Sequence, residues 1–506
     1  MKRRTFLLGG LGVAAGVTAV TSVPFARSMG SMMMGQGGYY RPSIKLQDFS
    51  LPALDEGSTI QGKQVFKLSL QSGESRILPK VSTPTIGINQ NFLAPVLRFK
   101  KNQTVRMEVT NKLNEVAALH WHGMILPATQ DGNPHQAIKP GDTWVAEWSI
   151  INEPATYFYH SHTHNHTGGQ VWRGLGGQMQ IVDEDRDAQL GIPHQYGVDD
   201  FPVIITDRAF AESGAFYYSN SGMQRMQGMH GNIILVNGVA NSVLKPKKSL
   251  IRLRLHNASN ARFYHLHFSD NRPFQLVATD GGLLEQPQTL DKIHLAPAER
   301  AEIIVDVSDG KAISLRNKKG YGNLSTGMMS MMGGANSLDS NFDVLYIDAS
   351  KAGKVAAFNT KQLVSLPDWS NVNVATTRKL QLDMKMGPAM MFGTGGFFIN
   401  NKAYDLHVIN EVTKANTFEV WELHNPSITH HPIHVHNTQF RILDRDGRPP
   451  YSWEGGLKDT VAVHADEMVR ILVPTGPYKN AKIPYMYHCH ILEHEDAGMM
   501  GQFTVT

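Results

Sequence analysis

The chain has 506 residues, of which 18% are charged, and a formal net charge of +4. One hydrophobic core rarely serves a chain of this length, so we expect about three domains. No long run of Lys and Arg is present, which argues against nucleic-acid binding. A single cysteine excludes an internal disulfide.

The N-terminus carries the features of an export signal. A Lys-Arg-Arg run at residues 2–4 precedes a Gly/Ala/Val-rich apolar stretch that ends near Val23. The paired arginines followed by Phe6 and Leu7 resemble a twin-arginine signal, so we expect residues 1–27 to direct the protein to the periplasm. An uncleaved membrane anchor is the alternative. No later segment has the ~20 consecutive apolar residues of a membrane-spanning helix. We therefore expect no membrane span once the signal has been removed.

The rest of the chain predicts an all-β protein. After a Met/Gly-rich linker at 28–45, short runs rich in Val, Ile and Thr lie between Gly and Pro turns. We expect three β-sandwich domains over 46–184, 185–347 and 348–506. An alternating strand that ends at Asn111, Asn257 or Asn425 appears in each of them. This echo predicts three copies of one sandwich.

The only cysteine lies in His488-Cys489-His490, which is followed by His494, Met499 and Met500. One thiolate, two imidazoles and a weak axial thioether form the ligand set of a blue-copper centre. If the segment is a strand, the flanking imidazoles face away from the sulfur. One short strand can therefore bind copper on both of its faces.

Other histidines also occur in closely spaced groups. An H-x-H spacing places two imidazoles on one face of a strand, which suits a metal ion or a metal pair. One such motif alone is more often a surface or core feature, but four of them, one around the only cysteine, predict a metal cluster. His164 and His166 continue the parity of the second motif and are alternative ligands. The remaining three motifs are His120-Trp121-His122, His160-Ser161-His162 and His431-Pro432-Ile433-His434-Val435-His436.

These motifs, H-W-H-G, Y-H-S-H, H-P-I-H-V-H and H-C-H-I-L-E-H-E-D-A-G-M-M, resemble those of the multicopper oxidase family. The resemblance covers nearly all of the chain after the signal. It implies three cupredoxin-like Greek-key β-sandwiches and four copper ions. Type 1 copper would belong to the third sandwich, and a three-copper cluster would lie between the first and third. The middle sandwich carries no ligand motif, so we expect a structural role for it.

The resemblance assigns each ligand in turn. It implies that type 1 copper binds His431, Cys489, His494 and Met499, that type 2 copper binds His120 and His434, and that the type 3 pair binds His122, His160, His162, His436, His488 and His490. Met500 is the alternative axial ligand.

The family's reaction oxidises a reductant by one electron at a time and reduces dioxygen to water with four. Electrons would leave the type 1 centre through Cys489. Asp131 and Glu495 match acidic positions near the cluster, and as general acids they could relay protons. Asp131 also begins an Asp-Gly-Asn-Pro turn signal, so a purely structural role is the alternative.

Fifteen of the 23 methionines fall in four clusters, at 29–34, 223–229, 328–332 and 384–391. Thioethers are soft ligands that select Cu(I), whereas core packing is the alternative role. Neighbouring Gly, Ser and Gln predict exposed loops around 223–229 and 328–332. The candidates for Cu(I) handling are Met223, Met226, Met229, Met328, Met329, Met331, Met332, Met384, Met386, Met390 and Met391.

Two departures from the family's cuprous oxidases concern the type 1 centre. Those enzymes place an acidic residue and Met before the position of His431, whereas this chain has Ser427-Ile428-Thr429-His430. The segment at 384–391 is also shorter than their Met-rich insert, so we expect a type 1 centre more open to organic reductants. We predict a monomeric oxidase of Cu(I), phenols or diamines that acts in copper tolerance. The alternatives are a general laccase and a copper-free structural relative.

Overall fold

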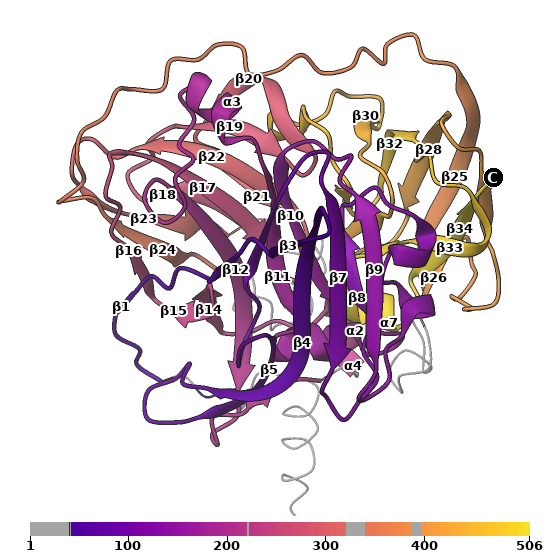
Figure 1. Ribbon diagram of the computed structural model, residues 1–506, viewed down its shortest axis with the longest axis horizontal. Helices are drawn as coiled ribbons and strands as arrows, with labels where there is room; N and C mark the ends of the chain where they lie inside the picture. The colour runs from indigo at the N-terminus through magenta and orange to yellow at the C-terminus, as the bar shows by residue number, and fades with distance from the viewer. Residues whose placement is uncertain (1–39, 41, 220–221, 320–339, 386–395) are drawn as a thin grey trace, which may run out of the picture. The chain divides into compact units, whose positions relative to one another are not determined.

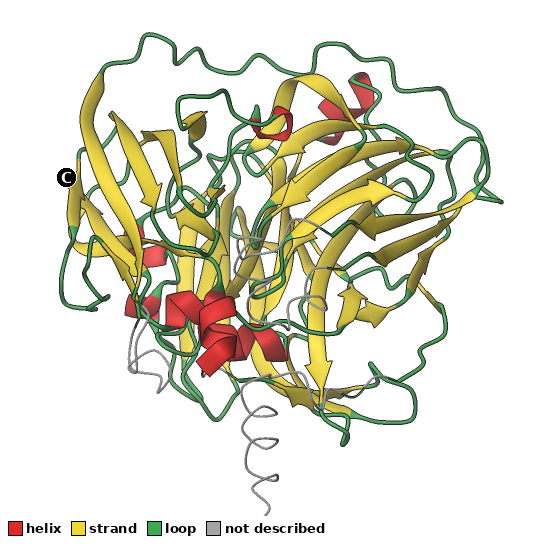
Figure 2. Ribbon diagram, turned by 180° about the vertical axis from the view of Figure 1, so that it is seen from behind, coloured by secondary structure: helices red, strands yellow, loops and turns green. Residues whose placement is uncertain are grey.

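The computed structural model describes residues 40, 42–219, 222–319, 340–385 and 396–506. The expected signal and most of the linker lie outside these residues. Strands dominate the described chain, and its helices are short (Figure 2). The described residues form six β-sheets that share three main hydrophobic cores, two sheets to each core. No helix among them is long and apolar enough to cross a membrane.

The first pair of sheets, drawn in indigo to purple in Figure 1, packs around Trp121, Trp148 and Tyr159. One sheet has the order β2-β6-β11-β10-β8, and the other has β3-β4-β7-β9 with β5 beside β4. The strands are β2 (Leu54–Asp55), β3 (Ser58–Ile60), β4 (Lys63–Ser75), β5 (Thr83–Ile88), β6 (Val96–Lys100), β7 (Thr104–Asn111), β8 (Leu119–His122), β9 (Thr143–Ser149), β10 (Ala155–Ser161) and β11 (Gly176–Val182).

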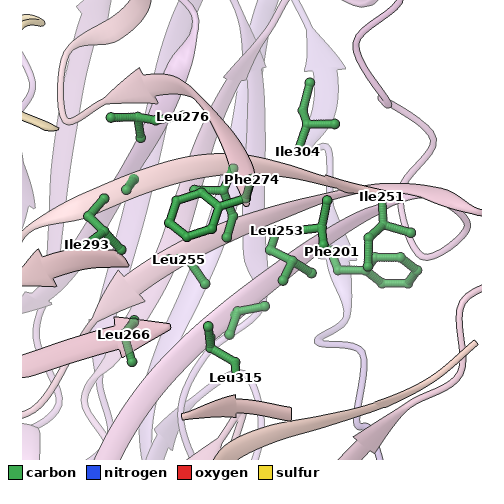
Figure 3. Packing of buried hydrophobic residues seen from close by; sticks show 14 of the residues in the cluster. Phe201, Ile251, Leu253, Leu255, Leu266, Phe274, Leu276, Ile293, Ile304 and Leu315 are labelled. Carbon is green, nitrogen blue, oxygen red and sulfur yellow. The ribbon is translucent and has the colours of Figure 1, made fainter. Parts of the chain in front are cut away.

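The middle pair of sheets encloses an aliphatic core. Leu253 and Leu255 of one sheet lie in the same cluster as Leu266 and Leu315 of the other (Figure 3). The strands of one sheet are β12 (Asp200–Phe210), β13 (Phe216–Tyr217), β14 (Ile233–Val236), β15 (Val239–Ala240), β17 (Leu250–Asn257), β19 (Phe274–Thr279), β20 (Gly282–Leu290) and β22 (Arg300–Asp306). Those of the other are β1 (Gln47–Asp48), β16 (Ser242–Leu244), β18 (Tyr264–Phe268), β21 (Lys292–Leu295), β23 (Ala312–Asn317) and β24 (Phe342–Asp348).

The third pair of sheets packs around Trp421 and Tyr487. One sheet contains β25 (Val374–Met384), β26 (Phe397–Ile399), β28 (Phe418–Asn425), β30 (Arg441–Arg445) and β32 (Glu467–Pro474). The other contains β27 (Glu411–Thr413), β29 (His431–Val435), β31 (Thr460–Val463), β33 (Asn480–Cys489) and β34 (Met500–Val505). The expected domain boundaries stay a prediction. They place β1 in the first sandwich, whereas β1 pairs in parallel with β16 of the middle one.

Short helices occupy the connections between strands. Helix α7 contacts both α2 and α4, and the three lie side by side in Figure 2. The α-helices are α2 (Thr167–Arg173), α3 (Glu184–Gln189), α4 (Gly222–Gln227) and α7 (Leu492–Asp496), and the 3-10 helices are η1 (Ala128–Gln130), η2 (Pro134–Gln136) and η4 (Ser452–Glu454). Helix α7 directly follows the Cys489 strand, so the contacts of α7 bear on the predicted copper ligands.

The echo at Asn111, Asn257 and Asn425 has a structural basis. Each asparagine is the last residue of its strand, and its amide oxygen accepts a hydrogen bond from a backbone nitrogen two residues later. Its amide nitrogen donates to a carbonyl oxygen four or five residues later. Because an asparagine can shape its own turn in this way, the repeated residue builds the same bend in each pair of sheets.

Candidate metal centre

Four strands bring the histidine motifs together. β8 pairs with β10, which sets His120 opposite His160, and β29 pairs with β33, which sets His434 opposite His488. Successive side chains on a strand point to opposite faces. Trp121, between the two histidines of its motif, is therefore buried in the first core while its neighbours face the third pair of sheets.

The predicted type 1 ligands converge at the end of β33. Cys489 Sγ lies 3.5 Å from His431 Nδ1 and 3.6 Å from His494 Nδ1, and the two nitrogens are 3.3 Å apart. Met499 is buried in the same hydrophobic cluster, and its carbonyl oxygen accepts a hydrogen bond from the Cys489 nitrogen. A thiol, two imidazoles and a thioether are thus gathered in one buried place.

The other predicted ligands gather between the first and third pairs of sheets. Their donor atoms form three groups, and within each group all donors lie within 4.8 Å of one another. His488 Nε2 is 3.2 Å from His162 Nε2 and 3.3 Å from His436 Nε2. Every one of these imidazoles is buried. The groups are His120, His122 and His434; His122, His160 and His490; and His162, His436 and His488.

Hydrogen bonds fix which ring nitrogen remains available. The Nδ1 atoms of His120 and His434 each donate to a backbone carbonyl at 2.8 Å. His122 is reversed, because its Nε2 lies 3.0 Å from a carboxylate oxygen of Asp459. In each case the opposite nitrogen has no hydrogen-bond partner among the described residues. Such second contacts typically set the tautomer of a metal-binding histidine.

The protonation of these donors suits copper. Burial lowers the pKa of His160 to about 4 and that of His494 to about 3, so both imidazoles are neutral at pH 7. Burial also raises the pKa of the Cys489 thiol, although a metal ion deprotonates the thiol that binds it. Buried lone pairs without partners are costly, and imidazole, thiolate and thioether together favour copper. The residues therefore fit copper ions.

Comparison with known proteins agrees with this chemistry. Two segments, residues 69–186 and 371–506, match family models described as multicopper oxidase. The chain is 33% identical over 451 residues to the multicopper oxidase mco of Staphylococcus haemolyticus, which covers 88% of this chain and 89% of that protein. The chain belongs to the multicopper oxidase family.

Two further relatives bear on the activity of this multicopper oxidase. The structure of a laccase-like multi-copper oxidase, CueO from Ochrobactrum sp., superimposes with a TM-score of 0.80 at 32% identity and covers 90% of this chain and all of that one. The cell division protein FtsP of Photorhabdus laumondii is 32% identical over 475 residues, covering 93% of this chain and 95% of that protein. The prediction of an all-β, cupredoxin-like fold is confirmed.

Asp131 joins the two halves of the cluster in this multicopper oxidase. Its Oδ2 lies 2.8 Å from His436 Nδ1, and its backbone oxygen accepts from His120 Nδ1. Burial raises the pKa of its carboxyl group. The turn signal is also real, since Gly132 has a φ of 77° and a Cβ there would collide with the Leu119 carbonyl. The turn and the contact with the ligands therefore coexist.

Glu495 contacts the same group of imidazoles from helix α7. Its Oε2 lies 3.1 Å from His488 Nδ1, and its Oε1 lies 3.4 Å from His162 Nδ1. The alternative ligands His164 and His166 are exposed and belong to none of the converging groups.

Asp459 is a contact of the candidate ligands that the sequence did not predict. Its side chain accepts from His122, and its backbone oxygen accepts from His434 Nδ1. Arg300 of the middle pair of sheets binds the same carboxylate through both Nη atoms. No spacing marks Asp459, because it reaches the cluster through the pairing of β29 with β31.

The expectation of exposed loops was wrong for two methionines. Met226 lies in helix α4, and both Met226 and Met229 are buried in hydrophobic clusters. Met384 ends β25, half-buried, and the Thr429 hydroxyl contacts its Sδ at 3.6 Å. The side chain of Met223, and all of Met328, Met329, Met331, Met332, Met386, Met390 and Met391, lie outside the described residues.

The expectation of an open type 1 centre was also wrong. His431 and His494 are both 0% exposed in the described structure. The outer nitrogen of His494 donates to the Met226 carbonyl at 3.1 Å, and that of His431 lies 3.0 Å from the Ser427 hydroxyl. Helix α4 from the middle part of the chain therefore covers His494, a predicted type 1 ligand, and the length of the 384–391 segment could not indicate this contact.

Proposed function

We propose that the protein binds four copper ions and couples one-electron oxidation of Cu(I) to four-electron reduction of dioxygen to water. The observation that supports this most strongly is the convergence of buried donors into one thiol-containing set and three imidazole groups. Type 1 copper would bind His431, Cys489, His494 and Met499; type 2 would bind His120 and His434; and the type 3 pair would bind His122, His160, His162, His436, His488 and His490. Bound copper would supply storage for electrons that arrive singly.

The protein provides the path and the protons. Cys489 is bonded through the backbone to His488 and His490, which gives a short covalent connection between the thiol and the imidazole groups. Asp131 and Glu495, both buried, each contact imidazoles of the cluster and can hold a proton there. As general acids they would supply protons to the reduced oxygen atoms.

Cu(I) is the favoured reductant because sulfur lies near the predicted type 1 centre and the imidazoles of that centre are buried. Met384 Sδ contacts Thr429, two residues before the type 1 ligand His431. Both type 1 imidazoles are enclosed, which disfavours direct contact with a phenol ring. We further propose export to the periplasm through residues 1–27 and a role in copper tolerance there.

A general laccase is the second candidate. The Ochrobactrum relative has oxidase activity towards lignin model compounds and lignosulfonate. Similarity to a cell division protein raises a third candidate, a role in cell division, and the converging set of metal donors favours an oxidase instead.

The test compares oxidation of Cu(I) and of a phenol, each with and without added Cu(II). Met384→Leu keeps the bulk of the side chain but removes its soft sulfur. We expect it to lower Cu(I) oxidation severalfold and to spare phenol oxidation. Met179→Leu, in the first core, is the matched control and should change neither rate. Equal activities in Met384→Leu and the parent protein would favour the laccase.

In a second variant, every methionine of the segments 328–332 and 384–391 is replaced by leucine, and the same two oxidation rates are measured. A loss of stability would show that these methionines pack in the core. The set is Met328, Met329, Met331, Met332, Met384, Met386, Met390 and Met391.

A further inference from the structure

The middle pair of sheets reaches the copper ligands through one arginine. Arg300, the first residue of β22, is fully buried. Its Nη1 lies 2.7 Å from Asp459 Oδ1, and its Nη2 lies 2.6 Å from Asp459 Oδ2. Two parallel charge-assisted hydrogen bonds of this kind fix a carboxylate in both position and orientation.

Asp459 in turn contacts two predicted ligands of different copper ions. Its Oδ1 accepts from His122 Nε2 at 3.0 Å, and its backbone oxygen accepts from His434 Nδ1 at 2.8 Å. The two rings stack with centroids 3.5 Å apart. The partner of one ring nitrogen sets the orientation of the other, metal-binding nitrogen. Asp459 therefore controls how both rings present their lone pairs.

The Arg300 side chain is itself held in place by hydrogen bonds. A guanidinium group has five N–H donors, and here all five are used. Besides the two bonds to Asp459, Nε donates to the Thr156 carbonyl, Nη1 to that of Ala298 and Nη2 to that of Asp280. A shorter or uncharged side chain cannot reproduce this fork. The position of Asp459 is thus held by three carbonyl groups that surround Arg300.

We propose that Arg300 is a positioning residue of the copper cluster, which acts through Asp459 on His122 and His434. The middle pair of sheets then contributes to the site itself, beyond the structural role expected from its lack of ligand motifs. This inference rests on the proposed copper assignment for its spectroscopic readout.

The test uses the full-length copper-loaded protein with Arg300→Lys and Arg300→Gln. We expect copper affinity at the cluster to fall roughly 10- to 100-fold, as for other changes in groups that hold metal ligands. The type 2 electron paramagnetic resonance signal should change, and the type 3 near-ultraviolet absorption should weaken. The blue type 1 absorption should stay as it is, because no type 1 ligand contacts Arg300 or Asp459.

Arg252→Lys is the matched control. Arg252 is buried in the same pair of sheets and pairs with Asp187 and Glu302, away from the histidines. It should lower the unfolding temperature without altering either cluster signal. Guanidinium ion added to Arg300→Ala should restore the type 2 signal, which a lost packing contact alone would not allow.

Asp459→Asn gives a second way to test the chain of contacts. It should reproduce the spectral change of Arg300→Lys if the arginine acts through this carboxylate. The proposal is overturned if Arg300→Lys leaves the cluster spectra and copper content unchanged, or if Asp459→Asn changes them and both Arg300 variants do not. Absence of type 2 and type 3 signals from the parent protein would instead refute the proposed function. A crystal structure of copper-free Arg300→Lys would then still show whether the His122 ring has turned.

Discussion

Replacement of Asp131 by asparagine should slow the reoxidation of the reduced protein by dioxygen. It should leave the reduction of the protein by its reductant unchanged. The asparagine amide oxygen can take the place of Oδ2 and still accept from His436 Nδ1 and Asn133 Nδ2. The shape of the site is kept, and what is lost is a carboxyl group that can take up and release a proton. A positioned general acid contributes roughly 100-fold or more to a rate, so its loss should slow reoxidation by about that factor.

Stopped-flow absorption separates the two half-reactions. Bleaching of the blue band by reductant without oxygen should match that of the parent protein. Reappearance of the band after the reduced Asp131→Asn protein meets oxygen should slow by roughly 100-fold or more. Because burial raises the pKa of Asp131, its proton is present below that pKa. The parent rate should therefore fall with rising pH, and the variant should lack that dependence.

A matched control excludes a general effect of losing a buried charge. Asp207, equally buried, pairs with Arg262 in the middle of the chain, so Asp207→Asn should lower stability but not the rate of reoxidation. Reoxidation of Asp131→Asn within about threefold of the parent rate would refute the reasoning, since loss of a general acid should slow the reaction far more than that. Slower bleaching would show that Asp131 acts in the reduction of the protein by its reductant, which also contradicts the reasoning.

Three further predictions concern the donors and the buried histidines. Cys489→Ser should lose the blue thiolate-to-copper band and keep most of the cluster copper by metal analysis; a blue variant would contradict the assignment. Met499→Leu should stay blue and raise the type 1 potential measured by redox titration, because a weak donor to the oxidised metal is removed. Burial lowers the pKa of His256 well below 6.5 and that of His230 to about 4. In copper-free protein, each of these two histidines should therefore lower the free energy of unfolding by about 1.4 kcal/mol per pH unit as the pH falls below ~6.5. This decrease should end when the pH reaches the pKa of that histidine in the folded protein. His256→Asn should reduce the slope of unfolding free energy against pH, measured by urea titration, by about 1.4 kcal/mol per pH unit, which is the contribution of one proton. An unchanged slope would count against burial of His256 as the cause.

The convergence of the candidate donors was predictable because their spacing is local. An H-x-H motif on a strand needs only the alternation of side chains to face one metal site, and Cys489 adds the opposite face. Asp459 was not predictable, since it lies 337 residues from the His122 ring that it contacts. The cover over His494 depends in the same way on a helix more than 260 residues away in the chain. Gly and Gln around Met226 indicated exposure, whereas tertiary packing buries the residue.

The asparagine turns show how this scaffold can change its chemistry. In the first and third pairs of sheets, the residues nine and eleven positions after the asparagine are histidines that face away from the core of their own pair: His120 and His122 after Asn111, and His434 and His436 after Asn425. In the middle pair the same spacing gives Leu266 and Phe268, which are fully buried in the core of that pair. The side-chain amide of Asn257 spans five residues to its carbonyl partner, whereas those of Asn111 and Asn425 span four. Because side chains alternate along a strand, one extra residue in a turn exchanges the two faces of the strand that follows. A metal-binding pair in the middle copy would therefore need a change in turn length as well as new ligands.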